Sequence, residues 1–313
     1  MSNTNNDSNQ SVNISDGKAG YSEFLKYLKN GNTKKAFRIK DKLVPKTLFK
    51  FIGLYDLPEC LKCKTTEQCY CTQCRTYEEC SLFKNNISKI EALKKNNLYL
   101  SGINALNDPF ELKYLYLDKS KSIYSKESSD LLKFIRNLVR VACFVGASPF
   151  SNMPMWAHYA NCHKGFCVEY AVKNSCYLYP VQYSPRREPV TNITDRIIFS
   201  MLEAIDNKQE ELSQEAQQLI IWLFLTGTVK YDFWKDEEEY RILYFASKSA
   251  EKGELVPLQD LGLEAKHIYI GTSCNERNRQ ELIRAAKGIN CLVSDTYIDE
   301  TRSDFTLRFI PVN

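Results

Sequence analysis

The sequence has no long hydrophobic run, few histidines and almost no excess of charge, and each of these absences argues against a class of function. No stretch approaches roughly eighteen consecutive apolar residues, so we expect no membrane span and no membrane partner. Lysine and arginine number 42 against 38 acidic residues, and a net charge of +4 does not by itself favour nucleic acid. The three histidines and the carboxylates show no metal-ligand spacing, which argues against a zinc nuclease.

The first nineteen residues are polar, rich in Asn and Ser, and lack the apolar core of a signal peptide. We therefore expect residues 1–20 to be a disordered tail on a cytoplasmic protein. The remaining length is sufficient to bury a substantial core. We predict a single domain over residues 21–313.

Cysteine, by contrast, is plentiful, with twelve in the chain. Six are scattered, and two of these, Cys143 and Cys167, lie in apolar strand-like runs where a reduced thiol packs as a small hydrophobe. The other six fall together in an excursion over residues 60–80, at Cys60, Cys63, Cys69, Cys71, Cys74 and Cys80. In a reducing compartment such crowding favours metal ligation over disulfides.

The spacing of these six thiols suggests a structural zinc site. The pairs Cys60/Cys63 and Cys71/Cys74 each have the C-x2-C spacing of a zinc knuckle. Cys69 and Cys80 could replace one of these pairs, bind a second ion through bridging sulfur, or stay free. We predict zinc ahead of an iron–sulfur cluster. An all-thiolate site leaves no open position, so the metal would clamp a small insertion and not catalyse.

The densest motif is Met155–Tyr170, which holds two of the three histidines and one of the three tryptophans. Its second part, Phe166–Tyr170, reads as a buried strand, with Gly165 as the turn residue before it. Turns before buried strands commonly present ligand-binding groups. The alternative is that the aromatic residues are ordinary core and the histidines lie on the surface. The candidate ligand-binding residues here are Trp156, His158, Tyr159 and Lys164.

The remaining periodicities predict an α+β fold on a bent, largely antiparallel sheet with a helical cover. A helical insertion over residues 192–228 is expected to cover one side of the sheet. A helix is expected from Ser88, where Ser88 and Glu91 form a capping box. Other expected helices are 21–42, broken near Gly31, 130–140 and 276–287. Expected strands are 47–54, 98–101, 141–145, 181–183, 240–245, 267–271, 290–293 and 306–311.

Two further polar segments lie next to predicted strands. Asn107, Asp108 and Pro109 force a turn, because the residue before proline avoids the helical region and Asx side chains bond back to the backbone. We expect Asp108 and Glu111 to be exposed near a strand end, where ligand pockets are common. The alternative is a plain turn with a helix cap.

The second segment precedes the strand at 240–245. If that strand begins early, Glu237, Glu239 and Arg241 project from one face. Two carboxylates beside an arginine are suited to orient a sugar hydroxyl and stabilise an oxocarbenium ion. The alternative is an exposed acidic start of a strand with a cross-strand ion pair.

Several of these motifs occur in the order seen in the domain-of-unknown-function family 2971, which the chain resembles from about Thr47 to Lys287. The cysteine excursion and the helical insertion are additions to that family pattern. The motifs that carry the resemblance are Leu48–Phe51, Leu98–Glu111, Met155–Phe166, Val181–Tyr183, Lys230 and Trp234–Arg241.

A weaker similarity extends to ADP-ribosyltransferase-like folds. It consists of an early strand with a polar residue between aromatics, a middle aromatic signature and a late strand with Glu-x-Glu. The resemblance implies that NAD is a substrate, that Lys50 contacts its nicotinamide half and that Glu239 is the catalytic carboxylate. It also implies a pocket wall of Trp156, His158 and Tyr159. Lys50 departs from the pattern, in which histidine or arginine is familiar.

Two functions from different classes follow. The first is an ADP-ribosyltransferase-like enzyme, acting in bacterial stress or phage defence, that passes ADP-ribose from NAD to a protein or nucleic-acid acceptor. NAD would lie between the Asn107 turn, the Trp156–Tyr159 turn and the Glu237/Glu239 pair. The alternative is a non-catalytic module that senses a nucleotide-type ligand or binds a protein, with the cysteine segment as its docking surface.

Overall fold

The structure is a computed structural model that describes residues 14–56, 81–102, 105–246 and 253–312. The six clustered cysteines, Cys60 to Cys80, lie outside these ranges. The chain divides into two compact units, residues 1–44 and residues 45–313. In the part of the chain that is described, every helix is too short or too polar to cross a bilayer.

The first unit is a pair of helices. Its helices are α1 (Ile14–Lys29) and α2 (Thr33–Leu43). Gly31 lies between them with a φ of 74°, a conformation that glycine adopts without strain, so the predicted break near Gly31 is confirmed. Phe24 is fully buried and meets the edge of Phe37. Helix α1 begins inside the expected tail, because its first turns fall before residue 20.

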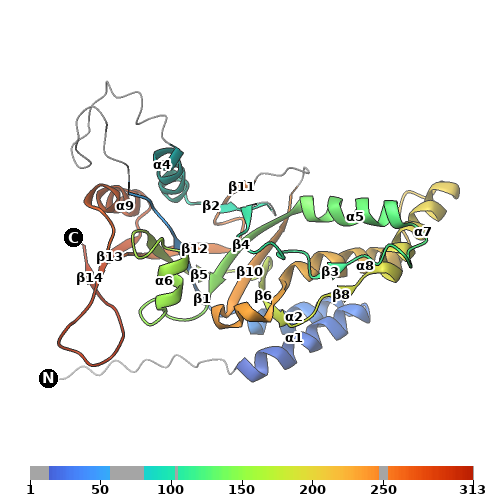
Figure 1. The fold of residues 1–313 in the computed structure, drawn as a ribbon, viewed down its shortest axis with the longest axis horizontal. Coiled ribbons are helices and arrows are strands. Elements are labelled where there is room, and N and C mark those ends of the chain that lie inside the picture. The colour runs from blue at the N-terminus through green and yellow to red at the C-terminus, as the bar shows by residue number, and fades with distance from the viewer. Residues whose placement is uncertain (1–13, 57–80, 103–104, 247–252, 313) are drawn as a thin grey trace. The chain divides into compact units, whose positions relative to one another are not determined.

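The second unit is built on an eight-stranded sheet in the order β14-β13-β12-β5-β1-β4-β10-β6 (Figure 1). Neighbouring strands are antiparallel except β12 and β13, which are parallel. The predicted α+β class with a mostly antiparallel sheet is therefore confirmed. The strands are β1 (Thr47–Ile52), β4 (Val139–Val145), β5 (Phe166–Val172), β6 (Leu178–Pro180), β10 (Glu239–Phe245), β12 (Leu263–Ile270), β13 (Leu292–Tyr297) and β14 (Arg308–Pro311).

Strand β5, near the centre of the sheet, is buried on both faces. Phe166, Cys167 and Val168 are successive residues of β5, and all three are fully buried. The predicted strand at Phe166–Tyr170 is thus confirmed, with β1 and β12 on either side of it. On one face, Phe51, Trp156 and Cys167 belong to a single cluster of buried side chains.

Shorter elements surround the sheet. Strand β2 (Asn97–Leu100) pairs with β11 (Glu254–Pro257), β3 (Leu115–Tyr116) with β8 (Glu188–Pro189), and β7 (Gln182–Ser184) with β9 (Val229–Tyr231). The predicted strand at 181–183 therefore leaves the main sheet as β7. The other helical elements are α4 (Ser81–Lys94), α6 (Met153–His158), η2 (Thr226–Thr228), η3 (Asp232–Glu237) and α9 (Glu276–Gly288).

The helical insertion forms, but its predicted role as a cover for the sheet is wrong. Its helices are α7 (Thr191–Asp206) and α8 (Gln214–Leu225), and they pack with α5 (Ser125–Leu138). Figure 1 shows these three helices extending beyond the strands. Their apolar faces meet one another through Leu132, Ile197 and Leu223. Phe224 of α8 contacts the last residue of β10, Phe245, at a ring distance of 5.1 Å.

The predicted capping box is also wrong. Helix α4 begins at Ser81, so Ser88 lies in its middle. The Ser88 hydroxyl donates to the carbonyl of Asn85, 2.9 Å away, as serines within helices do. A Ser-x-x-Glu spacing can arise inside a helix as well as at its start.

Candidate functional site

Five charged side chains from three separate segments meet beside strand β10. We call this set the acidic network, and four of its members are buried carboxyl or cationic groups that a core would normally exclude. Its members are Glu111, Lys230, Glu237, Glu239 and Arg241. Burial of so many charges requires that each be paired, and the distances show how.

Lys230 lies at the centre of the acidic network. Its Nζ donates to Glu237 Oε2 at 2.7 Å and to Glu239 Oε2 at 3.0 Å, and it lies 3.5 Å from Glu111 Oε1. The ring of Trp234 lies 5.0 Å from the same nitrogen. Burial alone would lower the pKa of Lys230, but the three carboxylates outweigh it and raise the pKa above its usual range. Lys230 is therefore fully protonated.

Arg241 holds the two deepest carboxylates together. Its Nε donates to Glu239 Oε1 at 2.8 Å, and its two terminal nitrogens donate to the oxygens of Glu111 at 3.0 and 3.2 Å. The carbonyl of Gly227 accepts a further bond at 2.7 Å. Burial would raise the pKa of Glu239, but Arg241 and Lys230 together lower it to about 2. Glu239 is therefore ionised, with both oxygens engaged.

Glu237 is the most exposed carboxylate of the acidic network, and we call the edge that it forms with Tyr159 the rim. Its side chain is 13% exposed, against 3% for Glu239. The phenol of Tyr159 donates to Glu237 Oε1 at 2.5 Å, and the side chain of Asn107 also hydrogen bonds to that phenol. Burial, then Glu237, raises the pKa of Tyr159, so the phenol keeps its proton. Of the three carboxylates, Glu237 is therefore the most accessible to a ligand.

A left-handed residue brings the two glutamates to one side. Strand β10 begins at Glu239, so Glu237 belongs to η3 and not to the strand. Between them, Glu238 has a φ of 46°, which is uncommon for a residue other than glycine. The convergence that strand alternation predicted is present, but it arises from this kink. Non-glycine residues in this region carry strain and cluster at functional sites.

The Asn107 turn contributes to the same site, although its acidic residues are buried. Asp108 Oδ1 accepts from the backbone N–H of Phe110 at 2.8 Å, which confirms the predicted Asx turn. The expectation that Asp108 and Glu111 are exposed is wrong, since 7% and 4% of their surfaces are accessible. Ion pairing with Arg241 offsets the desolvation of Glu111.

Lys50 lies within the electrostatic reach of the acidic network but does not bond to it. Its Nζ donates to the carbonyl of Cys143 at 3.1 Å and lies 5.4 Å from the Phe144 ring centre. Burial lowers the pKa of Lys50, and its electrostatic interactions with Cys143 and Glu239 partly oppose this. Lys50 is therefore a residue of β1 whose ammonium group is held by the backbone of the neighbouring strand β4.

The other residues predicted from the central motif lie elsewhere. Trp156 is fully buried, and its indole N–H donates to the carbonyl of Pro149 at 2.7 Å, so it is a core residue. His158 is exposed at the end of α6. Lys164 pairs with Asp56 at 2.6 Å. In the described part of the chain, no contact joins any of these three to the acidic network.

The turn that follows α6 differs from the predicted one. Asn161, Cys162 and His163 all have positive φ, at 50°, 54° and 64°. Gly165 has a different role, because a Cβ on it would lie 2.0 Å from the carbonyl oxygen of Ile52. The chain thus turns at Asn161–His163, and Gly165 permits close packing of two backbones.

Sequence reasoning missed three residues of the site. These are Lys230, Trp234 beside it, and Tyr183, whose phenol accepts from the backbone N–H of Glu239 at 3.0 Å. All three lie in motifs of the family resemblance, but none was predicted to belong to the site. A lone lysine between Val229 and Tyr231 in a short strand was the available signal. Within the described ranges, no group of three or more His, Cys, Asp or Glu is arranged to hold a metal.

Comparisons with known proteins give one match. Neither the curated proteins nor the solved structures contain a match to this chain. Residues 155–242 match the model of a family described as a protein of unknown function (DUF2971). The matched segment contains Tyr159, Lys230, Glu237, Glu239 and Arg241, which places most of the acidic network inside the family pattern.

Proposed function

We propose that this chain is an ADP-ribosyltransferase-like enzyme that cleaves NAD at the acidic network and passes ADP-ribose to a protein or nucleic-acid acceptor. The observation that carries the proposal is the rim carboxylate, Glu237, held between a phenol and an ammonium group. Such fixed groups are ready to act on a ligand without reorganising. Segments that are distant in sequence supply them, since Asn107 and Glu111 precede Tyr159 by some fifty residues.

The charge of the acidic network suits the nicotinamide end of NAD. Three carboxylates face two paired cations, Lys230 and Arg241, which leaves one negative charge in excess. The nicotinamide ring of NAD is cationic, and positive charge moves to the ribose as the bond to the ring breaks. Negative charge fixed near that ribose stabilises the transition state.

The proposed reaction has one bond broken and one formed. The bond between C1 of the ribose and the ring nitrogen breaks, and nicotinamide leaves with the bonding electron pair as a neutral molecule. The acceptor nucleophile then forms a bond to C1, and its proton passes to Glu237 or to water. Tyr159 holds Glu237 in position through its hydrogen bond.

The roles within the glutamate pair differ from those predicted by resemblance. Glu237 and Glu239 both have each oxygen hydrogen bonded, but the Glu237 side chain is 13% exposed and that of Glu239 only 3%. Both bonds of Glu239 are to buried cations, so this carboxylate is closed to a ribose hydroxyl. We assign it to positioning Lys230 and Arg241. Glu237 is the carboxylate that would contact the ligand, and Arg241 holds the buried side of the network.

The direct test measures nicotinamide release from NAD labelled in its adenylate part, in the presence of a cell extract. Wild type should release nicotinamide, and Glu237→Gln should lose at least about tenfold in rate. Glu238→Gln is the matched control, because Glu238 is the exposed neighbour. Label found on protein or on nucleic acid names the acceptor class. Equal release by wild type and Glu237→Gln would overturn the proposal.

An alternative function is a non-catalytic module that senses a ligand or binds a partner. Two aromatic rings next to the rim favour it, since Phe233 is 75% exposed and Tyr231 is 49% exposed. Their rings stack, with centres 6.3 Å apart. Exposed aromatics of this kind are typical of binding surfaces. This alternative predicts no nicotinamide release and a saturable partner lost in Phe233→Ala.

A further inference from the structure

We propose that Arg136 and Arg187 form a phosphate-binding site on the segment Leu112–Leu115. Arg136 donates from Nε to the carbonyl of Leu112 at 3.0 Å and from Nη2 to that of Leu115 at 3.2 Å. Arg187 donates from Nε to the carbonyl of Lys113 at 2.8 Å and from Nη2 to the same Leu115 carbonyl at 3.2 Å. Two guanidinium groups therefore converge on one carbonyl oxygen.

The two charges are not neutralised by these bonds. Carbonyl oxygens satisfy N–H groups but carry no net charge, and within the described ranges neither guanidinium forms an ion pair with a carboxylate. The nearest acidic neighbour in sequence, Glu188, hydrogen bonds to the phenol of Tyr114. Burial and then the charge of Arg187 lower the pKa of Arg136, as expected for like charges held close together.

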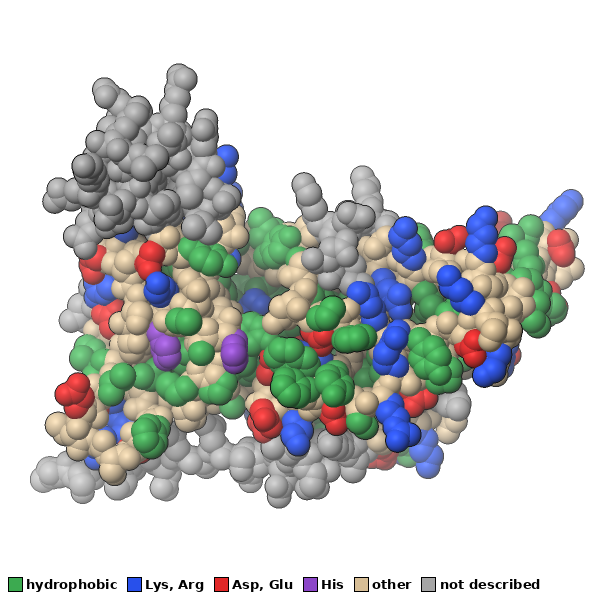
Figure 2. All heavy atoms as spheres, in the orientation of Figure 1, with side chains coloured by type: hydrophobic (Ala, Val, Ile, Leu, Met, Phe, Trp, Pro, Cys, Tyr) green, Lys and Arg blue, Asp and Glu red, His purple; other side chains and the backbone are tan. Residues whose placement is uncertain are grey.

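A phosphate group matches the unused N–H donors and the positive charge of the two arginines. Each guanidinium has five N–H donors, of which the carbonyls use those of Nε and Nη2, so both retain donors for an anion. A bridging phosphate would relieve the repulsion and accept bidentate bonds from both forks. Arg187 and Lys113 are exposed, so the ligand has access from solvent. Figure 2 shows Lys and Arg side chains gathered over the region of β3 and α5.

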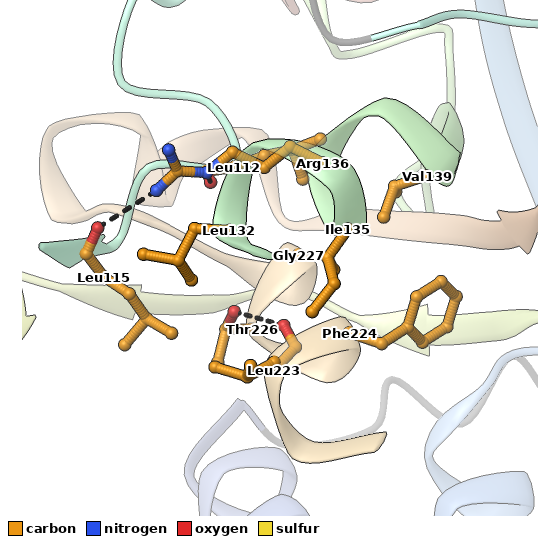
Figure 3. A pocket seen from close by; sticks show the side chains of 10 residues that line it. All are labelled: Leu112, Leu115, Leu132, Ile135, Arg136, Val139, Leu223, Phe224, Thr226 and Gly227. Carbon is orange, nitrogen blue, oxygen red and sulfur yellow. Dashed lines mark hydrogen bonds between the residues drawn. The ribbon is translucent and has the colours of Figure 1, made fainter. Parts of the chain in front are cut away.

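The surroundings fix the arginines in place. Figure 3 shows the Arg136 side chain lying along a pocket lined by Leu112, Leu132 and Ile135, with its guanidinium bonded to Leu115. The Arg187 guanidinium lies 5.6 Å from the ring centre of Tyr116. If the arginines served only to hold the segment, neutral donors would do so without the repulsion between two cations.

The position of the site connects it to the acidic network. Glu111 immediately precedes the segment Leu112–Leu115 and contacts Arg241 and Lys230. Lys230 and Arg241 are already paired, so they are unsuited to hold the diphosphate of a dinucleotide. Assigning that diphosphate to Arg136 and Arg187 rests on the proposed function, whereas phosphate binding itself does not.

The test is calorimetric titration of the full-length protein with inorganic pyrophosphate. Arg187→Gln should weaken binding by at least about tenfold. Arg187→Lys should weaken it as well, because a lysine keeps the charge but loses the fork. Arg186→Gln is the matched control, since Arg186 is an exposed neighbour whose bonds to Ser184 involve its backbone. Melting temperatures confirm that each variant is folded.

Competition then identifies the source of the phosphate. ADP that displaces pyrophosphate indicates a free nucleotide, and single-stranded DNA that displaces it indicates a nucleic-acid backbone. Both results support the site. Absence of pyrophosphate binding by wild type at millimolar concentration would overturn it, as would equal weakening in Arg186→Gln and Arg187→Gln. Because no NAD is present, failure here is distinct from failure of nicotinamide release.

Discussion

At the residue scale, the aromatic residues of the central motif show what a sequence can and cannot distinguish. Trp156 and Tyr159 are three positions apart and both were candidates for a ligand pocket. Trp156 is buried against Phe51, while the Tyr159 phenol bonds to Glu237. The pattern predicted that the motif is important, but a partner 78 positions away decides which ring carries the polar contact.

The low pKa of Glu239 leads to a prediction about the stability of the protein in acid. The pKa of Glu239 falls from 4.5 to about 2 on folding, so its ionised form stabilises the folded state fully above pH 4.5. This contribution, on the order of 3 kcal/mol, is lost as the pH falls from 4.5 towards 2.

We therefore expect the difference in unfolding free energy between wild type and Glu239→Gln to narrow as the pH falls. Urea denaturation from pH 6 down to the lowest pH at which wild type folds measures this difference. Glu238→Gln, at an exposed neighbouring position, supplies the control and should show little change. A difference that stays constant over this range would contradict the assignment of Glu239 as an ionised, buried partner.

At the element scale, local patterns predicted elements better than their arrangement. Alternation located β5 and β10, and helical periodicity located α7 and α8. The packing of α7 and α8 on α5 was not predictable, because it depends on contacts between distant segments. The same holds for the kink at Glu238, which no local signal marks.

The packing of the turn before β5 against β1 gives a prediction at this scale. A Cβ at position 165 would lie 2.0 Å from the Ile52 carbonyl oxygen and 2.8 Å from Gly53 Cα. Both neighbours are backbone, so Gly165→Ala should destabilise the protein by about 3 kcal/mol or more. Gly288→Ala is the control, because nothing lies within 4 Å of the Cβ it would add. Similar melting temperatures for the two variants would show that the turn has room to adjust.

At the scale of the whole molecule, the sequence contains a cysteine excursion at residues 60–80 that lies outside the residues described by the structure. The prediction of a structural zinc ion rests on the spacing of Cys60/Cys63 and Cys71/Cys74. We expect purified protein to contain about one zinc ion or more per chain. Elemental analysis measures this directly, and Cys60→Ser with Cys63→Ser should lower the content. Cys176→Ser, at a scattered and exposed cysteine, should leave it unchanged.

The division into two units also bears on the site. All the residues of the acidic network and of the arginine pair belong to residues 45–313. The segment 155–242 that matches the family model supplies Lys230, Glu237, Glu239 and Arg241, while Glu111 comes from outside it. A site composed in this way could be anticipated from motif order, but its geometry required the fold.

The central claim is that Glu237, held by Tyr159, acts on NAD. The most direct measurement is the rate of nicotinamide release by wild type, Tyr159→Phe and Glu237→Gln, each compared at equal folded concentration. The account predicts release by wild type, a reduced rate in Tyr159→Phe because Glu237 loses its hydrogen bond, and the lowest rate in Glu237→Gln. Equal rates in all three proteins, or no release by wild type, would contradict it.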